Sequence, residues 1–170
     1  MRIIVDGFGG DNSPEAVVKG CVKAVENYDV EILLTGNEEK LKEIFTLNSL
    51  SQNNIIIYNT ESVIDMHDSA KLILREKKDS SMGLGLQLLA NGEGDAFVSA
   101  GSTAALVFGA STIVKRIKGI KRASLATVIP SDGSKVTWFS TNPEYVSVSE
   151  TGLVKAEKIY YKNPTDTEAS

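Results

Sequence analysis

Short runs of β-branched and aliphatic residues alternate with longer stretches of helical periodicity along the first 130 residues of the chain. Glycine, proline or polar residues bound each short run, which is typical of a buried strand. Strands that alternate with helices pair in parallel, because parallel neighbours require a crossover connection. The sequence therefore predicts an α/β fold, with a doubly wound, mainly parallel sheet and helices on both faces. The five predicted strands are Ile3–Val5, Val30–Thr35, Asn54–Tyr58, Asp95–Val98 and Ser124–Ile129.

The first predicted helix begins shortly after the first strand. Ser13 fits the N-cap and Pro14 the first helical position, where a proline's missing N–H is tolerated. The single cysteine, Cys21, lies on the apolar stripe of this helix, so we expect a buried and unreactive thiol. Helical spacing predicts four further helices, over Glu38–Phe45, Asp68–Lys77, Ser81–Asn91 and Ala104–Ile117.

The pattern changes after Pro130. Polar and apolar residues now alternate with a period of two, and turn residues interrupt them, which predicts a short C-terminal β-hairpin or meander. We therefore expect residues 1–130 to form the α/β domain and residues 131–170 a β-rich tail that is not an independent domain. The alternating segments are Lys135–Phe139, Tyr145–Val148 and Leu153–Ala156.

Composition excludes several classes of function. The formal net charge of −4 gives no general attraction for nucleic acid, and no apolar run approaches the ~18 residues of a membrane helix. One cysteine excludes an internal disulfide and favours a cytoplasmic location. A Ser-His-Asp triad would require His67, the only histidine, whose neighbours fit a solvated position better. No Cys/His cluster has zinc spacing, so we expect no metal and no cofactor.

A glycine-containing loop follows the first predicted strand. Gly9 and Gly10 allow a tight turn and the close approach of backbone N–H groups to a ligand, and a helix N-terminus follows, which favours phosphate. Asp11 opposes this, because a carboxylate repels phosphate unless a proton, a metal or a basic side chain intervenes. The alternative is that Asp11 or Ser13 only caps the helix. The glycine spacing does not match the dinucleotide-binding fingerprint.

A second loop, after the fourth predicted strand, is rich in hydroxyls. Ser99, Gly101, Ser102 and Thr103 lie between a buried strand and an uncharged helix start. Hydroxyls and helix N-terminal amides both donate to phosphate oxygens. The alternative, that Ser102 or Thr103 caps the helix, does not exclude phosphate binding. No Walker lysine follows, which disfavours a nucleotide triphosphatase. Both loops fall at the carboxyl ends of predicted parallel strands, where such sheets bind ligands.

Two clusters of basic residues lie near predicted helix ends. Cations there complement the helix dipole, and they could equally attract an acidic partner. The first cluster is Lys71, Arg75, Lys77 and Lys78, and the second is Lys115, Arg116, Lys118, Lys121 and Arg122.

Four stretches of sequence carry a more specific signal. They are Ile4-Val5-Asp6-Gly7-Phe8-Gly9-Gly10-Asp11 with Pro14; Lys77-Lys78-Asp79-Ser80-Ser81-Met82 with Gly85-Leu86; Asp95-Ala96-Phe97-Val98-Ser99-Ala100-Gly101-Ser102-Thr103; and Arg116-Ile117-Lys118-Gly119-Ile120 with Leu125-Ala126-Thr127-Val128-Ile129-Pro130. In this order they resemble the N-terminal half of the bacterial phosphate acyltransferase (PlsX) family over residues 1–130.

The resemblance implies an incomplete Rossmann-like domain of acyltransferase type. It implies transfer of a fatty acyl group from acyl-carrier protein to inorganic phosphate, for phospholipid synthesis. Half of a doubly wound sheet leaves an unprotected edge, which predicts a homodimer. Hydrogen phosphate is ionised near neutral pH and a thiolate leaves readily, so such a site needs orientation and fixed oxyanion donors more than a strong base. The phosphate-binding residues expected are Gly9, Gly10, Asp11, Ser99, Gly101, Ser102 and Thr103, the second basic cluster is expected to bind the carrier protein, and the catalytic candidates are Lys78, Ser80 and Ser102.

The tail resembles two families. Val136–Pro143 with Thr151–Val154 resembles a bacterial Ig-like (group 2) strand pair, whereas Pro143–Tyr145 and Ala156–Lys158 are similar to the segment that follows in the acyltransferases. Two alternatives to an enzyme therefore remain. One is a truncated or engineered non-catalytic remnant with an anion pocket. The other is a structural or interaction protein led by the Ig-like tail. Membrane association is not supported by this half.

Overall fold

The computed structural model describes residues 1–65, 67–116 and 118, and the backbone of four short strands beyond them. The chain divides into two compact units, Met1–Lys115 and Arg116–Ser170.

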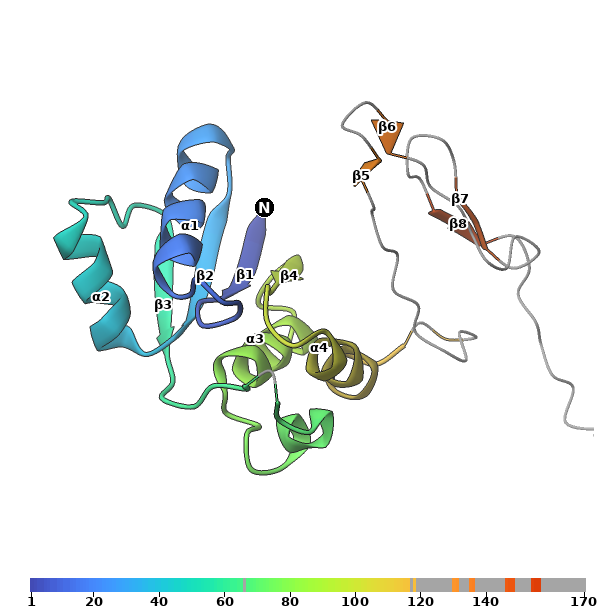
Figure 1. Ribbon diagram of the computed structural model, residues 1–170. Coiled ribbons are helices and arrows are strands. Elements are labelled where there is room, and N and C mark those ends of the chain that lie inside the picture. The colour runs from blue at the N-terminus through green and yellow to red at the C-terminus, as the bar shows by residue number, and fades with distance from the viewer. Residues whose placement is uncertain are drawn as a thin grey trace, which may run out of the picture. The chain divides into compact units, whose positions relative to one another are not determined.

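Four parallel strands form the sheet of the first unit (Figure 1). They are β1 (Arg2–Asp6), β2 (Glu31–Gly36), β3 (Ile55–Asn59) and β4 (Ala96–Val98), in the order β3-β2-β1-β4. Ile4 of β1 pairs with Leu33 of β2 on one side and with Phe97 of β4 on the other. The predicted parallel α/β sheet is therefore confirmed. The fifth predicted strand, Ser124–Ile129, lies outside the described residues.

Helices cover both faces of this sheet, as predicted, because successive residues of β1 point to opposite sides. Val5 packs in a core with residues of α1 (Glu15–Asn27) and α2 (Glu38–Leu47). Ile4 packs on the other face with Leu33 and with Leu88 of α3 (Ser81–Ala90). The connection through α3 brings the chain back past β1, so the strand order reverses between β1 and β4.

The predicted N-cap of the first helix is wrong. Pro14 is the N-cap of α1, and no side chain accepts a hydrogen bond from the first turn, so neither Ser13 nor Asp11 caps the helix. The Ser13 hydroxyl instead donates to the carbonyl oxygens of Phe8 at 3.0 Å and Gly10 at 2.7 Å. Ser13 therefore stabilises the loop that precedes the helix.

Two other predicted helices are shorter than expected. Of Asp68–Lys77, only Ala70–Leu74 is helical, as a 3-10 helix, because the carbonyl of Leu72 accepts the amides of both Arg75 and Lys77 and closes a turn.

The last predicted helix, Ala104–Ile117, is regular only over α4 (Thr103–Gly109), and a π-helical turn follows over Ala110–Val114. There the Ser111 and Thr112 hydroxyls each donate to a carbonyl one turn back at 2.7 Å, which competes with regular helical bonding. No helix among residues 1–65 and 67–116 is long and apolar enough to cross a membrane.

The described strands of the second unit form two short antiparallel pairs. One joins β5 (Pro130–Ser131) to β6 (Lys135–Val136), and the other joins β7 (Val146–Val148) to β8 (Val154–Ala156). The β7–β8 pair is the hairpin expected from the alternating pattern. The remainder of the predicted strands in this region falls outside the described residues, and the division of the chain at residue 130 stays a prediction.

Cys21 provides a test of the α1 packing. Its side chain is buried in the core between α1 and the sheet, and burial raises the pKa of the thiol to about 12. We expect almost no reaction with a disulfide reagent at pH 8 in the native chain, and one thiol per chain after unfolding in guanidinium. Rapid labelling of the native chain would contradict this packing.

Candidate functional site

The two glycine-containing loops meet at the carboxyl ends of β1 and β4. An ideal Cβ on Gly9 would lie 2.8 Å from the amide nitrogen of Gly101, and one on Gly10 would lie 3.0 Å from the Cβ of Ala100. Neither first-loop position has room for a larger side chain, and Gly10 also has a φ of +100°. The two loops are thus in direct contact at the point where the strand order reverses.

Asp6, the last residue of β1, lies under this junction. Its side chain is only 2% exposed. One carboxylate oxygen accepts the Phe8 amide at 3.2 Å, and the other accepts the Ser99 hydroxyl at 2.8 Å. Asp6 is not among the residues predicted for the site. The sequence feature that indicates a role for Asp6 is its place at the end of a buried apolar strand, directly before a glycine-containing loop.

The second loop uses some of its polar groups internally. The Gly101 amide donates to the Ser99 hydroxyl oxygen at 3.0 Å, and the Ser102 hydroxyl oxygen accepts the Ala105 amide at 3.4 Å. Ser102 is therefore the N-cap of α4. The amides of Ser102, Thr103 and Ala104 form no hydrogen bond with another described residue.

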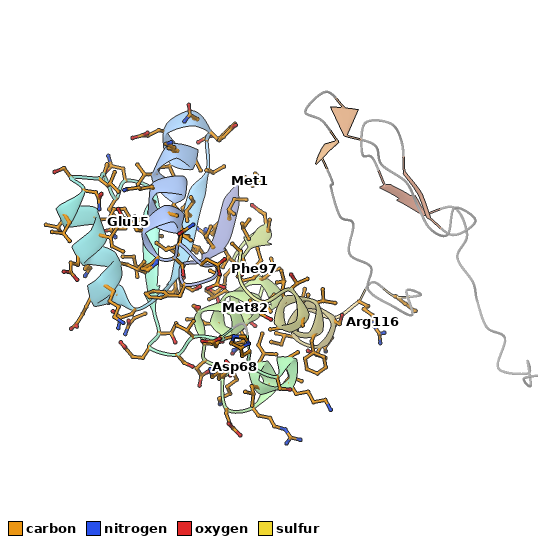
Figure 2. The ribbon with its side chains drawn as sticks, viewed as in Figure 1. Met1, Glu15, Asp68, Met82, Phe97 and Arg116 are labelled. Atoms are coloured by element: carbon orange, nitrogen blue, oxygen red, sulfur yellow. The ribbon has the colours of Figure 1, made fainter. Side chains whose placement is uncertain are left out.

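A third polar corner lies at the start of α3. Ser80 is fully buried, and its hydroxyl oxygen caps α3 by accepting the Gly83 amide at 3.1 Å. The adjacent Met82 reaches the second loop, since its Cε lies 3.1 Å from an ideal Cβ on Gly101. Figure 2 shows Met82 near Phe97 of β4, and the two belong to one apolar cluster. The Ser81 hydroxyl, also buried, has no hydrogen-bond partner among the described residues.

The turn before α3 is held by an ion pair. The Lys77 ammonium contacts the Asp68 carboxylate and donates to the Val63 carbonyl at 2.9 Å. The hydrogen bond from Lys77 lowers the pKa of Asp68 below its usual value. Lys77 is thus engaged in the fold, whereas the catalytic candidate Lys78 is exposed. His67 is exposed too, as expected of a solvated residue.

The second basic cluster is described only in part. Lys115, Arg116 and Lys118 are exposed, whereas Lys121 and Arg122 lie outside the described residues. No group of three or more His, Cys, Asp or Glu side chains that could hold a metal ion occurs in the part of the chain that the structure describes.

These features define a class of protein, namely a doubly wound α/β domain with polar loops gathered where the strand order reverses. The sequence model of the family described as "Fatty acid synthesis protein" matches residues 1–140. The chain therefore belongs to this family, and the resemblance stated for residues 1–130 is confirmed.

Individual relatives agree with this assignment. A phosphate acyltransferase from Clostridium perfringens (strain SM101) is 44% identical over 131 residues, which cover 76% of this chain and 39% of the relative. One from Clostridium novyi is 35% identical over 166 residues, covering 96% of this chain and 50% of the relative. The chain thus spans half or less of the length of these relatives.

Solved structures show the same fold. A phosphotransacetylase from Streptococcus pyogenes superimposes with a TM-score of 0.58 at 22% identity, over 82% of this chain and 46% of that chain. The EutD phosphotransacetylase from Staphylococcus aureus gives a TM-score of 0.55 at 20% identity, over 82% of this chain and 45% of that chain. These likenesses confirm the α/β architecture.

Substitution of Gly9 tests the close approach of the two loops. A Cβ at this position would lie 2.6 Å from the Asp6 carboxylate and 2.8 Å from the Gly101 amide nitrogen. We expect Gly9→Ala to lower the free energy of unfolding by about 1–3 kcal/mol, because backbone atoms must move. The measurement is urea unfolding.

Gly20→Ala is the matched control for Gly9→Ala. No atom lies within 4 Å of an ideal Cβ at Gly20, an exposed position inside α1. We expect this variant to be more stable than the parent by about 0.5–1 kcal/mol, because alanine favours a helix. Equal behaviour of the two variants would argue against close contact at Gly9.

The Lys77–Asp68 pair predicts a pH dependence of stability. The pKa of Asp68 is lowered in the folded chain, so the pair stabilises the fold above the ordinary pKa of about 3.9 and ceases to do so as the pH falls through the lowered value. We expect Lys77→Met to lower the Tm at pH 7, and the difference from wild type to shrink in acid. Lys23→Met, at an exposed lysine, should show neither effect. A difference in Tm that is constant with pH would exclude a role for the Asp68 charge.

Proposed function

We propose that the chain takes part in the transfer of a fatty acyl group from acyl-carrier protein to inorganic phosphate, which gives acyl phosphate and free carrier protein for phospholipid synthesis. Family membership and the relatives named phosphate acyltransferase support acyl transfer to phosphate. The neighbours described as phosphotransacetylases share the fold. Because the chain spans 39% to 50% of these relatives, the donor, the partners and the activity are proposals.

The observation that carries the proposal is the meeting of the two loops at the reversal of strand order. There the amides of Ser102, Thr103 and Ala104 have no hydrogen-bond partner among the described residues, and the glycines let the two loops pack directly against each other. Hydrogen phosphate keeps one proton, which reduces its repulsion by the exposed Asp11 carboxylate. We assign phosphate binding to the two loops that carry Gly9, Gly10, Asp11, Ser99, Gly101, Ser102 and Thr103, in which the Gly101 amide and the Ser99 hydroxyl are already engaged with Ser99 and Asp6 respectively and hold the loops together.

The reaction itself makes modest demands on such a site. A phosphate oxygen attacks the thioester carbonyl carbon, the carbon–sulfur bond breaks, and the thiolate takes up the proton that phosphate loses. Free amides stabilise the charge that develops on the carbonyl oxygen. The hydroxyls of Ser80 and Ser102 accept an amide each and still carry a proton to donate. The Lys78 ammonium, exposed near Ser80, offsets phosphate charge.

We assign binding of the acyl-carrier protein to the second basic cluster. Lys115, Arg116 and Lys118 are exposed after α4, and Lys121 and Arg122 follow in the sequence. Cations clustered on a surface steer an acidic partner.

An open sheet edge supports a homodimer. Among the described strands, β4 pairs only with β1, so its other edge is open to a strand of a second copy. A cytoplasmic location fits the single thiol of Cys21.

The direct test is release of carrier thiol. Incubation of the chain with an acyl-carrier protein thioester should produce free thiol and acyl phosphate only when phosphate is present. Replacement of Lys115 and Lys118 by glutamate should raise the KM for the acylated carrier roughly tenfold while the KM for phosphate stays constant. Lys23→Glu, at an exposed lysine of α1, is the matched control.

Binding of phosphate without turnover is the second candidate function. It is favoured by the observation that this chain spans only 39% of the length of a phosphate acyltransferase relative. Phosphate should then raise the Tm of the chain while no thiol is released. If phosphate neither stabilises the chain nor promotes release of thiol, both functions are excluded for this chain.

A further inference from the structure

A chain of hydrogen bonds connects the two loops through a buried carboxylate. The Gly101 amide donates to the Ser99 hydroxyl oxygen at 3.0 Å, and the Ser99 hydroxyl donates to Asp6 at 2.8 Å. The other oxygen of Asp6 accepts the amide of Phe8 at 3.2 Å. The connection therefore runs from the loop after β4 to the loop after β1 and joins residues 93 positions apart in the sequence.

Burial makes this connection stiff. A carboxylate that is 2% exposed is costly unless hydrogen bonds satisfy it, and bonds to a charged acceptor are stronger than bonds between neutral groups. Loss of either donor would leave part of the charge unsatisfied. Gly9 packs directly against the group, since an ideal Cβ there would lie 2.6 Å from the carboxylate oxygen that Ser99 contacts. The two loops are consequently held at one spacing.

We infer that Asp6 is the positioning residue of the proposed anion site. Its carboxylate fixes the loop after β1 relative to the loop after β4, through Ser99, and so sets the spacing of the two loops between which the anion is proposed to bind. This role rests on the proposed function. Asp6 acts through Ser99 and touches no substrate, because Gly9 and Ser99 cover the oxygen on that side.

Two other roles for Asp6 make different predictions. A carboxylate that acts only by its charge repels a bound anion, so its neutralisation would tighten binding. A carboxylate that accepts the proton of hydrogen phosphate distinguishes phosphate from sulfate, which carries no proton near neutral pH. A positioning residue affects both anions equally, because it acts on the shape of the site.

The experiment measures the dissociation constants of phosphate and of sulfate for the full chain by calorimetry. We expect Asp6→Asn and Ser99→Ala each to weaken both anions roughly tenfold, with the double variant no weaker than the single ones, because the two residues act as one unit. Ser99→Thr keeps the hydroxyl and should restore most of the affinity. Asp29→Asn, exposed, and Ser111→Ala, beyond α4, are the matched controls.

A second readout does not depend on any ligand. Hydrogen exchange of the Gly101 amide, followed by NMR, should accelerate in Asp6→Asn and in Ser99→Ala and stay unchanged in both controls. Ser99→Ala carries the test if Asp6→Asn does not fold, since Ser99 is only half-buried.

Several results would overturn the inference: tighter phosphate binding in Asp6→Asn, a loss confined to phosphate, or unchanged affinities in both variants. Failure of the proposed function looks different. A wild-type chain that binds phosphate but releases no thiol leaves the positioning role to be decided by the variants. A wild-type chain that binds neither anion removes the site and this role together.

Discussion

The pairing of β1 with β4 determines where polar groups gather in this chain. Strand order runs β3-β2-β1-β4, so the helices that follow β1 and β4 leave the sheet in different directions from adjacent strands. Neighbouring strands lie only about 4.8 Å apart, so the loops that follow them must pass each other closely. Gly9 and Gly101 make that approach sterically feasible, because a Cβ at Gly9 would lie 2.8 Å from the Gly101 amide nitrogen and a Cβ at Gly101 would lie 3.3 Å from the Gly9 Cα.

The hydroxyls around this junction do two things at once. Ser80, Ser99 and Ser102 each accept a backbone amide and so fix the start of a helix or a loop. A hydroxyl that accepts still has its own proton to donate. The Ser99 hydroxyl donates its proton in a hydrogen bond to Asp6, whereas the hydroxyls of Ser80 and Ser102 donate to no described acceptor. The site is therefore rich in donors. This suits a proposed reaction in which hydrogen phosphate is already ionised and a thiolate leaves readily, so the scarcity of histidine does not matter.

Much of the fold could be predicted from local patterns. The runs around Ile4 and Leu33 form strands because β-branched and aliphatic residues fill a sheet that is covered on both faces. Helix ends were predicted less well. Residues 68–77 carry helical spacing, but Asp68 is drawn to Lys77 and the chain turns instead. The helix after Thr103 ends early because the Ser111 and Thr112 hydroxyls donate to backbone carbonyls one turn back. Such competition depends on contacts that periodicity does not reveal.

The candidate site likewise combines features that local sequence reveals with contacts that only the folded chain reveals. Glycine and hydroxyl residues after two strands indicate a surface of donors, and the structure brings those loops together. Ser13 was misassigned because its hydroxyl bonds back to Phe8, within its own loop. Asp6 was missed for a different reason: as the last residue of a strand it has no local pattern, and its partner Ser99 is 93 positions away. A sequence displays the groups that can donate to a ligand. The acceptor that holds those groups in place becomes apparent only when the strands are paired.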